Sequence, residues 1–302
     1  MTPSDTAGKL VLVTGSTGGI GMETARGLAR RGASVVLVGR ELSRARQAAR
    51  EIKESAGHDR VDALAADITC LDALRRLASE VADRHDTLDV LINNVGVNPP
   101  VRTLTADGVE TMFAAHVLAP FTLTHLLLPL LRRAGGARVI NLTGGIPGGP
   151  IERDNLQGER RYLGWTFSHY NHTKTMTMAM TLRLARELEG SAVTANVIYP
   201  GHGHTPMNKA TPIGAFPLLY RPIAPLVLKI VAPLLLSDLS KPARSSIYAA
   251  SSAEMKGVTG VYVDDKCRRK PLPDSALDPA NQEAVWDLCV RLSGRTPGQR
   301  AG

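Results

Sequence analysis

The amino-acid sequence predicts an α/β fold, in which a doubly wound parallel sheet is flanked by helices. Two observations carry this prediction. Short apolar runs rich in Val, Leu and Ile alternate along the chain with longer segments of helical periodicity. The runs are apolar at almost every position, which is typical of strands buried on both faces. Right-handed connections between such strands place helices on each side of the sheet.

The predicted elements follow one another in a regular order, each early strand leading into a helix. Strands are expected at 9–15, 33–40, 61–68, 88–94, 137–143, 192–201 and 260–264. Helices are expected at 19–31, 43–55 and 71–84, then as one or two helices ending near 133, and at 169–189. No linker, internal repeat or low-complexity segment interrupts the chain, so all 302 residues are expected to form one domain.

Composition excludes several classes of protein. The 36 Lys and Arg outnumber the 28 Asp and Glu, but they form only short clusters without a recognition motif, so no nucleic-acid partner is expected. A phosphate-bearing small ligand accounts for part of the excess. Cys70, Cys267 and Cys289 lack CxxC spacing, which argues against disulfides or zinc and fits a reducing compartment. No apolar run precedes the first strand, so no signal peptide is expected, and we predict a cytoplasmic protein.

A glycine-rich turn joins the first predicted strand to the first predicted helix. Gly15, Gly19 and Gly21 stand there in LVLVTGSTGGIGMETARGLARRG. Glycine lets the backbone approach a pyrophosphate closely, and the N-terminus of the helix presents N–H groups to it. The strand–turn–helix context makes this pattern more specific than the glycines alone. The sequence therefore predicts a Rossmann-type dinucleotide site.

The end of the second predicted strand indicates which dinucleotide is bound. An acidic residue at that place would bind the ribose 2′-hydroxyl group of NAD(H). This chain has Arg40 instead, with Arg44 one helical turn later. The planar guanidinium group pairs well with a phosphate. NADP(H) is therefore the predicted cofactor, and the alternative is a surface arginine that binds no ligand.

The single domain is expected to have two functional parts. The cofactor half spans about 8–145, and the catalytic helix, a lid and the C-terminal part span about 146–294. The lid is the apolar stretch at 214–238, which prolines, Arg221 and Lys229 interrupt too often for a bilayer span. This stretch is interpreted as a substrate lid, with a peripheral membrane contact or a dimer contact as alternatives.

Five motifs occur in a characteristic order and spacing: TGSTGGIG, AADIT, INNVG, YNHTK and PGHGHT. On these motifs the chain resembles the short-chain dehydrogenase/reductase superfamily. Over about 8–294 it is similar to the retinol dehydrogenase branch, notably in DGVETMFAAHVLAPFTLTHLLLPLL. The resemblance implies a homo-oligomer formed through paired helices. It also implies a set of cofactor-binding residues: Gly15, Ser16, Thr17, Gly19, Ile20 and Gly21 at the pyrophosphate, Asp67 and Ile68 at the adenine, Asn94 and Gly96 beside the cofactor, Pro200, Gly201 and Thr205 over the carboxamide.

The resemblance further implies that Tyr170 is the proton donor or acceptor and that Lys174, one helical turn later, lies on the same face and binds the cofactor with it. Physical chemistry supports this pairing. A phenol with a pKa near ~10 is a poor base at neutral pH. An ammonium group at i+4, together with the positive nicotinamide ring, favours the phenolate and is expected to bring the pKa of Tyr170 toward the working range.

Two positions depart from the family pattern. Gly144 stands where the resemblance expects a serine, and His116 stands where it expects an asparagine in the central helix. The missing hydroxyl removes one donor to the substrate oxygen, a loss typically of about 10²- to 10³-fold in rate. Thr143 replaces that donor only if the loop turns its side chain round, since alternation along the strand sends it to the opposite face. The imidazole of His116 is expected to preserve a proton relay in altered form.

Three functions are open at this point. The first is an NADP(H)-dependent oxidoreductase acting on a carbonyl or alcohol of a bulky, apolar small molecule, with Tyr170, Lys174, His116 and Thr143 as the candidate catalytic residues. The second is a non-redox cyclase, dehydratase or isomerase that keeps NADP(H) binding and uses Tyr170 and His116 as acid and base. The third is a non-catalytic dinucleotide-binding protein. No metal is expected, although four histidines lie near the predicted pocket, namely His169, His172, His202 and His204.

Overall fold

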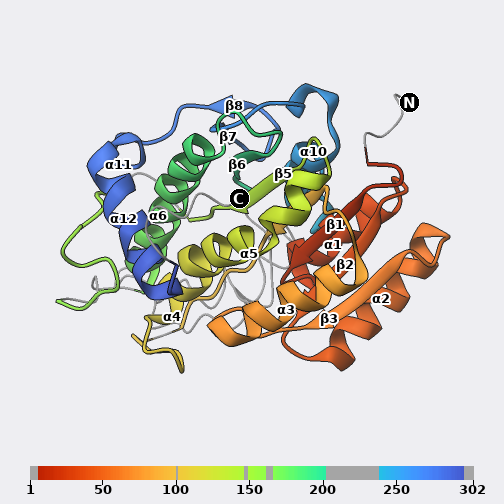
Figure 1. Cartoon of the computed structure of the whole chain (residues 1–302), viewed down its shortest axis with the longest axis horizontal. Coiled ribbons are helices and arrows are strands. Elements are labelled where there is room, and N and C mark those ends of the chain that lie inside the picture. The colour runs from red at the N-terminus through yellow and green to blue at the C-terminus, as the bar shows by residue number, and fades with distance from the viewer. Residues whose placement is uncertain (1–5, 100, 146–148, 161–165, 202–237, 296–302) are drawn as a thin grey trace, which may run out of the picture.

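The computed structural model describes residues 6–99, 101–145, 149–160, 166–201 and 238–295. They form one domain around an eight-stranded sheet of strand order β3-β2-β1-β4-β5-β6-β7-β8 (Figure 1). The strands β1 to β6 run parallel to their neighbours, and β7 runs parallel to β6, in the doubly wound arrangement that the apolar runs predict. The strands are β1 (Leu10–Thr14), β2 (Ser34–Gly39), β3 (Val61–Ala65), β4 (Val90–Asn93), β5 (Arg138–Leu142), β6 (Thr194–Ile198), β7 (Tyr262–Val263) and β8 (Arg269–Lys270).

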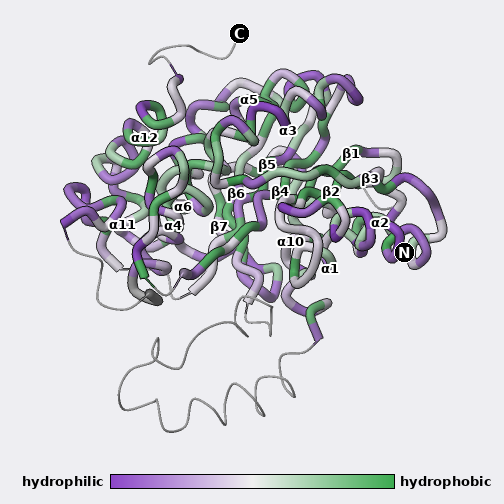
Figure 2. The backbone as a smooth tube through the Cα atoms, turned by 90° about the horizontal axis from the view of Figure 1, so that it is seen from below, coloured by the Kyte–Doolittle hydropathy of each residue, from purple (hydrophilic) through white to green (hydrophobic). Residues whose placement is uncertain are grey.

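Helices cover both faces of the sheet and separate two hydrophobic cores. One core lies against α3, α5, α6 and α12, and the other lies against α1, α2 and α10. Figure 2 shows the hydrophobic residues concentrated on the central strands, with hydrophilic residues toward the periphery. The helices are α1 (Gly19–Ala29), α2 (Leu42–Ala56), α3 (Leu71–Arg84), α4 (Thr111–Phe113), the π-helix η1 (Ala114–Leu118), α5 (Ala119–Arg133), α6 (Thr166–Glu187), α10 (Ser240–Ser251), the 3₁₀ helix η5 (Ala253–Met255), α11 (Asp274–Leu277) and α12 (Pro279–Ser293).

Three features of the fold differ from the sequence prediction. The strand β8 is antiparallel to β7, because a tight turn through Cys267 joins them into a hairpin at the sheet edge. The strand β3 is not buried at every position, since Asp62 and Ala65 are exposed at the opposite edge. The helix that carries Tyr170 begins three residues earlier than expected, at Thr166, and ends at Glu187. Strand edges and helix ends depend on neighbours that local periodicity does not reveal.

One helical segment in the described part of the chain is long and apolar enough to cross a membrane. It runs through α4, η1 and α5, Thr111–Arg133, with a mean hydropathy of 1.6. The fold itself buries 83% of its apolar window, because the segment packs between the sheet, α3 and α6. Its apolar surface is therefore used in the core. The predicted lid at 214–238 lies outside the described residues, apart from Asp238.

The C-terminal helix α12 packs across α6 and α5, as Figure 1 shows. Trp286 on α12 meets the ring of Phe121 edge-on, with ring centres 4.8 Å apart, and the guanidinium of Arg183 lies over the indole at 4.7 Å. Arg183 also pairs with Glu283 of α12 at 2.7 Å. Part of the surface of α5 and α6 is thus covered by the chain's own terminus. The homo-oligomer through paired helices stays a prediction.

Candidate active site

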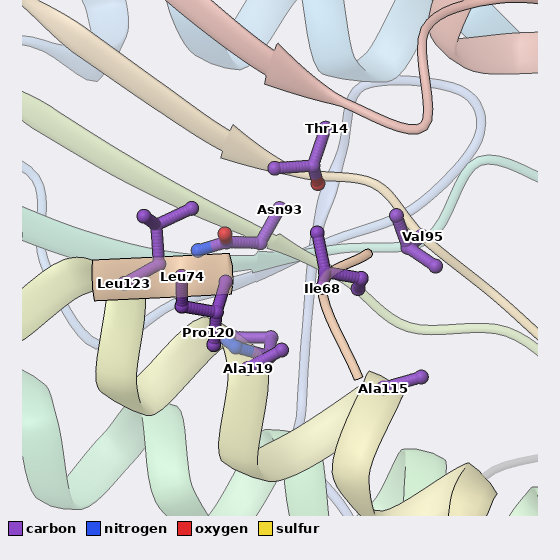
Figure 3. Close-up of a pocket in the computed structure, with 9 residues that line it drawn as sticks. All are labelled: Thr14, Ile68, Leu74, Asn93, Val95, Ala115, Ala119, Pro120 and Leu123. Carbon is purple, nitrogen blue, oxygen red and sulfur yellow. The ribbon is translucent and has the colours of Figure 1, made fainter. Parts of the chain in front are cut away.

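The candidate site lies at the carboxyl ends of the central strands. The strand order reverses between β1 and β4, which is where ligands bind in doubly wound sheets. A small pocket of about 190 Å³, including solvent at its mouth, opens there (Figure 3). Its walls come from the ends of β1 and β4, from α3 and from the helix through η1 and α5. They are Thr14, Ile68, Leu74, Asn93, Val95, Ala115, Ala119, Pro120 and Leu123.

The turn from β1 into α1 (residues 14–21, here called the cofactor turn) is packed too tightly for side chains at Gly15 and Gly21. Gly15 and Gly19 adopt positive φ angles of 64° and 61°. A Cβ atom at Gly21 would lie 2.4 Å from Nδ2 of Asn94 and 2.5 Å from the carbonyl oxygen of Gly15. The amide of Asn94 holds the turn by donating to two carbonyl oxygens at its start, at 3.0 and 3.2 Å. This bare backbone at a helix N-terminus fits a dinucleotide pyrophosphate.

The two hydroxyl residues of the cofactor turn have different surroundings. The buried Ser16 hydroxyl donates to the Val13 carbonyl at 2.7 Å and accepts the Val38 N–H at 3.1 Å. Its side chain therefore ties β1 to β2, as does its backbone N–H, which donates to the Val38 carbonyl at 3.2 Å. Thr17 lies against Gly39 at the end of β2, where a Cβ atom would come within 2.2 Å of its methyl group. The sequence analysis did not single out Gly39, whose missing side chain makes room for the turn.

Arg40 follows directly after β2 and is exposed. It forms no ion pair with any residue that the structure describes. Arg44 differs from it, because its guanidinium pairs with Glu41 at 3.1 Å. Arg40 is therefore the better placed of the two arginines to meet a ribose phosphate.

Of the two predicted adenine-side residues, one lines the pocket. Ile68 is buried and lines the pocket in Figure 3. Asp67 is exposed, and its Oδ1 accepts hydrogen bonds from the N–H and hydroxyl of Thr69 at 3.0 and 2.7 Å. Ile20 packs against the hydrophobic core near α1, and Gly96 lies in the loop after β4.

Tyr170 and Lys174 lie on one face of α6, as their spacing predicts. The Lys174 ammonium is 5.8 Å from the centre of the Tyr170 ring and donates to the Leu142 carbonyl at 3.0 Å. Burial lowers the pKa of Lys174 from 10.5 to about 7. Burial also raises the pKa of Tyr170, with a further contribution from Tyr199. Burial disfavours the charged form of both groups. The expectation that Lys174 and the positive nicotinamide ring together lower the Tyr170 pKa stays a prediction.

Gly144 lies directly beside the Tyr170 hydroxyl. A Cβ atom at Gly144 would stand 2.7 Å from Oη of Tyr170, so the phenol occupies the space where a serine side chain would begin. Thr143 does not fill the missing role, because its buried hydroxyl donates to the Lys174 carbonyl at 3.3 Å. The loop has not turned this side chain round. Gly144, Tyr170, Lys174 and His116 are called the Tyr170 cluster below.

His116 is the fourth member of the Tyr170 cluster and lies in the π-helical turn η1. Its ring meets the Tyr170 ring edge-on, with centres 5.1 Å apart. Its Nε2 accepts the Val97 N–H at 3.0 Å, and its Nδ1 is 2.8 Å from the Thr173 hydroxyl. Both ring nitrogens are thus engaged. This arrangement does not fit the expected proton relay.

The remaining histidines do not form a metal site in the described residues. His169 pairs with Glu110 at 3.2 Å, and His172 accepts the Glu152 N–H at 3.1 Å. Burial is the main cause that lowers the pKa of His172 to about 4. No group of three or more metal-ligating side chains occurs in the part of the chain that the structure describes. His202, His204 and Thr205 lie outside that part.

The loop after β6 reaches the edge of the candidate site. Pro200 and Gly201 directly follow Tyr199, whose backbone N–H donates to the Val263 carbonyl at 2.9 Å. Gly201 has a φ of 81°, and a Cβ atom there would lie 3.0 Å from Cβ of Asp265. The hairpin of β7 and β8 therefore backs this loop.

A buried polar network beneath the Tyr170 cluster was not predicted from the sequence. Asn93 donates to Asn141 at 2.8 Å, and Asn141 donates to the Thr181 hydroxyl at 2.9 Å. Thr173, Thr177 and Thr181 lie on the buried face of α6 at intervals of four residues. That spacing is visible in the sequence and was its only signal, since threonines on a helix more often donate to their own backbone.

Comparisons with known proteins agree with this geometry. A family model described as short chain dehydrogenase matches residues 9–213. Human retinol dehydrogenase 13 is 32% identical over 95% of this chain and 85% of its own length. Retinol dehydrogenase 14 of Mus musculus is 34% identical over 95% of this chain and 86% of its own length.

Solved structures are similar as well. An uncharacterised protein from Mycobacterium paratuberculosis superposes with a TM-score of 0.74 at 26% identity, covering 97% of this chain and 96% of its own. The RhlG/NADP active-site complex from Pseudomonas aeruginosa has a TM-score of 0.65 at 27% identity, covering 87% of this chain and 97% of its own.

Proposed function

Because this chain belongs to the short-chain dehydrogenase family, in its retinol dehydrogenase-like branch, we propose that it is an NADP(H)-dependent oxidoreductase for a bulky, apolar alcohol or carbonyl compound. The family and these relatives support the oxidoreductase class directly. The choice of NADP(H) and the class of substrate are the parts that we add.

The observation that carries the proposal is the placement of the Tyr170 hydroxyl. It lies beside the bare backbone of Gly144 at the carboxyl end of β5, and Lys174 lies on the same helical face. Tyr170 donates its proton to the substrate oxygen in reduction and accepts one in oxidation. The Lys174 amine, whose pKa of about 7 allows it to gain or lose a proton near neutrality, replenishes that proton. NADP(H), when bound, supplies or accepts the hydride.

Support for NADP(H) comes from Arg40 and from the similar RhlG structure, which is a complex with NADP. Arg40 is exposed at the end of β2 without an ion-pair partner among the described residues, so its guanidinium is available to a 2′-phosphate. We expect Arg40→Glu to lower the ratio of kcat/KM for NADPH over NADH by about 10- to 100-fold. Arg50→Glu, an exposed arginine on α2, is the matched control. An unchanged ratio in Arg40→Glu would exclude this role.

Support for an apolar substrate comes from the names of the relatives, which are retinol dehydrogenases. Retinol and retinal are bulky, apolar molecules with an alcohol or aldehyde group at one end. The apolar stretch at 214–238 agrees in composition with a lid over such a substrate. We also carry the cytoplasmic location as a proposal, which the three free cysteines support.

The non-redox alternative is less well supported than the redox function. It needs His116 as an acid or a base, and both ring nitrogens of His116 are already hydrogen bonded inside the fold. The non-catalytic alternative predicts that Tyr170 can be replaced without consequence.

One experiment separates the three functions. The purified protein is incubated with cell extract as a substrate pool, and separately with all-trans-retinal, using NADPH deuterated at the pro-S C4 position. We expect a deuterium-labelled alcohol whose rate of formation falls by about 10²- to 10⁴-fold in Tyr170→Phe. A Tyr170-dependent product without deuterium and with the cofactor unspent would favour non-redox chemistry. NADPH binding without any Tyr170-dependent product would favour a binding protein.

A further inference from the structure

The helix that carries His116 changes its hydrogen-bonding pattern at that residue. The π-helical turn η1 interrupts an otherwise α-helical segment between α4 and α5. Such turns are rare and occur frequently at functional sites. The His116 carbonyl accepts the Thr177 hydroxyl from α6 at 2.9 Å, so the irregular turn is bound to the helix that carries Tyr170. The side chain of His116 is 1% exposed.

The bonding partners of His116 determine its tautomer. The Val97 N–H can only donate, so Nε2 must be an acceptor and carry no proton. The Thr173 hydroxyl has a single proton, which it gives to the Tyr170 carbonyl at 2.9 Å. The oxygen of Thr173 therefore accepts the proton on Nδ1 at 2.8 Å. The network is satisfied only by a neutral imidazole protonated at Nδ1.

The surroundings of His116 also oppose a second proton. Burial lowers its pKa well below the ordinary value, and nearby Lys174 and His169 lower it further. An imidazolium would need to donate from Nε2, where it meets another donor. Gaining a proton therefore costs His116 one of its two hydrogen bonds.

The two hydrogen bonds of the His116 ring, called the bridge below, join two segments that both border the reaction site. Val97 lies in the loop after β4, three residues beyond Asn94, which holds the cofactor turn. Thr173 lies on α6 and bonds the backbone of Tyr170. The His116 ring also packs edge-on against the Tyr170 ring, at an interplanar angle of 81°. The position of the phenol thus depends on His116 through both packing and hydrogen bonds.

We propose that His116 is a positioning residue: a permanently neutral imidazole that ties the loop after β4 to the Tyr170 turn of α6 and so holds the Tyr170 hydroxyl in place. It does not carry protons for the reaction. This inference rests on the proposed function in that Tyr170 is taken as the group that exchanges a proton with the substrate.

Steady-state kinetics of variants at His116 and at its partner Thr173 test the bridge. His116→Phe keeps a flat ring but removes both hydrogen bonds, and Thr173→Val removes the hydroxyl that Nδ1 donates to. We expect each variant to lower kcat by about 10- to 100-fold with little change in KM for NADPH, because Tyr170 is misplaced rather than lost. The double variant is expected to be no worse than the poorer single variant, and Thr173→Ser is expected to restore most of the activity.

Thr175→Val is the matched control for these variants. Thr175 is equally buried on α6, and its hydroxyl donates only to the Asn171 carbonyl at 3.0 Å. We expect it to leave kcat unchanged. Losses in His116→Phe and Thr173→Val that simply multiply in the double variant would contradict a shared bridge.

The pH dependence separates positioning from proton relay. If His116 only positions Tyr170, the kcat profile of Thr173→Val keeps the shape and midpoints of the wild-type profile at a lower height. A midpoint that appears in the wild type and in Thr173→Val but disappears in His116→Phe would identify a relay and overturn the proposal.

Nuclear magnetic resonance tests the bridge without any activity. In protein labelled with ¹⁵N-histidine, the His116 signals are assigned by their absence in His116→Phe. We expect the ¹⁵N shifts of a neutral ring protonated at Nδ1, unchanged from pH 5.5 to 9. Protonation within that range, or the opposite tautomer, would overturn the proposal. If the wild type reduces no carbonyl compound while this signal is as expected, the proposed function fails and the bridge stands as a structural one.

Discussion

The cofactor turn and the Tyr170 cluster lie at the same edge of the sheet but are built in opposite ways. The cofactor turn depends on missing side chains, because a Cβ atom at Gly15 or Gly21 within it, or at Gly39 beside it, would lie too close to a neighbouring atom. The Tyr170 cluster depends on filled space. Its lysine amine, histidine nitrogens and neighbouring threonine hydroxyls are all engaged by partners within the fold.

This difference explains why the two regions tolerate change differently. At positions where the backbone must leave room for a phosphate, only glycine fits, so these glycines remain recognisable in a single sequence. A hydrogen-bonded cluster can be rebuilt with other donors and acceptors, provided that each buried group finds a partner. Gly144 and His116, which look like defects in the family pattern, are both accommodated by their neighbours in this structure.

The largest effect that we expect comes from adding a side chain at Gly21 in the cofactor turn. Gly21→Ala would place a Cβ atom 2.5 Å from the backbone oxygen of Gly15, which has no side chain to move aside. We expect a loss of about 3 kcal/mol in the free energy of unfolding and at least a tenfold weaker affinity for NADPH, roughly 1.4 kcal/mol.

Gly18→Ala is the control at the same turn. Its Cβ atom would meet nothing within 4 Å, and the φ of Gly18 is an extended 176°. Urea unfolding and fluorescence titration with NADPH measure both quantities. Equal losses in the two variants would show that space is not what the turn requires.

A smaller effect concerns the pH dependence of stability in the Tyr170 cluster. The Lys174 pKa is 10.5 in the reference state and about 7 in the fold, so between these values the unfolded chain binds more protons than the folded one. The free energy of unfolding of the cofactor-free protein should therefore rise with pH over this window. We expect wild type to gain on the order of 2 to 3 kcal/mol relative to Lys174→Met between pH 7 and 9.5.

Urea unfolding of both proteins at pH 7, 8 and 9.5 measures this gain. Lys256→Met, which removes an exposed lysine, is the control and should not gain relative to wild type over the window. A flat difference between wild type and Lys174→Met would mean that Lys174 keeps its proton in the fold.

The smallest effect tests the fit between Gly144 and Tyr170. A Cβ atom at Gly144 would lie 2.7 Å from the phenol oxygen, so we expect Gly144→Ala to cost about 1 to 2 kcal/mol in the free energy of unfolding. Gly144→Ser should not raise activity, although it restores the family residue. The cost of the alanine should shrink in a Tyr170→Phe background, where the oxygen is gone.

Thermal unfolding of the four proteins in this cycle gives the coupling between the two sites. Gly149→Ala, whose Cβ atom would meet nothing within 4 Å, is the control on the same loop. Higher activity in Gly144→Ser than in wild type would contradict the view that the Tyr170 cluster is rebuilt around Gly144. The glycine would then be only the loss of a hydroxyl group.

Much of the fold follows from local pattern. The buried strands and the amphipathic helices were predictable because each carries its own periodicity, and right-handed connections between the strands predict the doubly wound arrangement. The antiparallel β8, the half-exposed β3 and the first turn of α6 were not predicted in detail. The turn η1 was also not predicted, because its hydrogen bonds include one from Thr177 of a distant helix.

In the candidate site too, some features follow from local sequence and others only from the tertiary structure. By itself the sequence determined the glycine turn, Arg40 at the end of β2 and the spacing of Tyr170 and Lys174, since each depends on neighbours within a few residues. Only the tertiary structure decided that the Tyr170 hydroxyl fills the space at Gly144, that Thr143 bonds to Lys174, and that His116 bridges Val97 and Thr173. These contacts join segments 19 to 57 residues apart in the chain. Their hydrogen bonds and pKa values depend on burial and partners that exist only once the chain has folded.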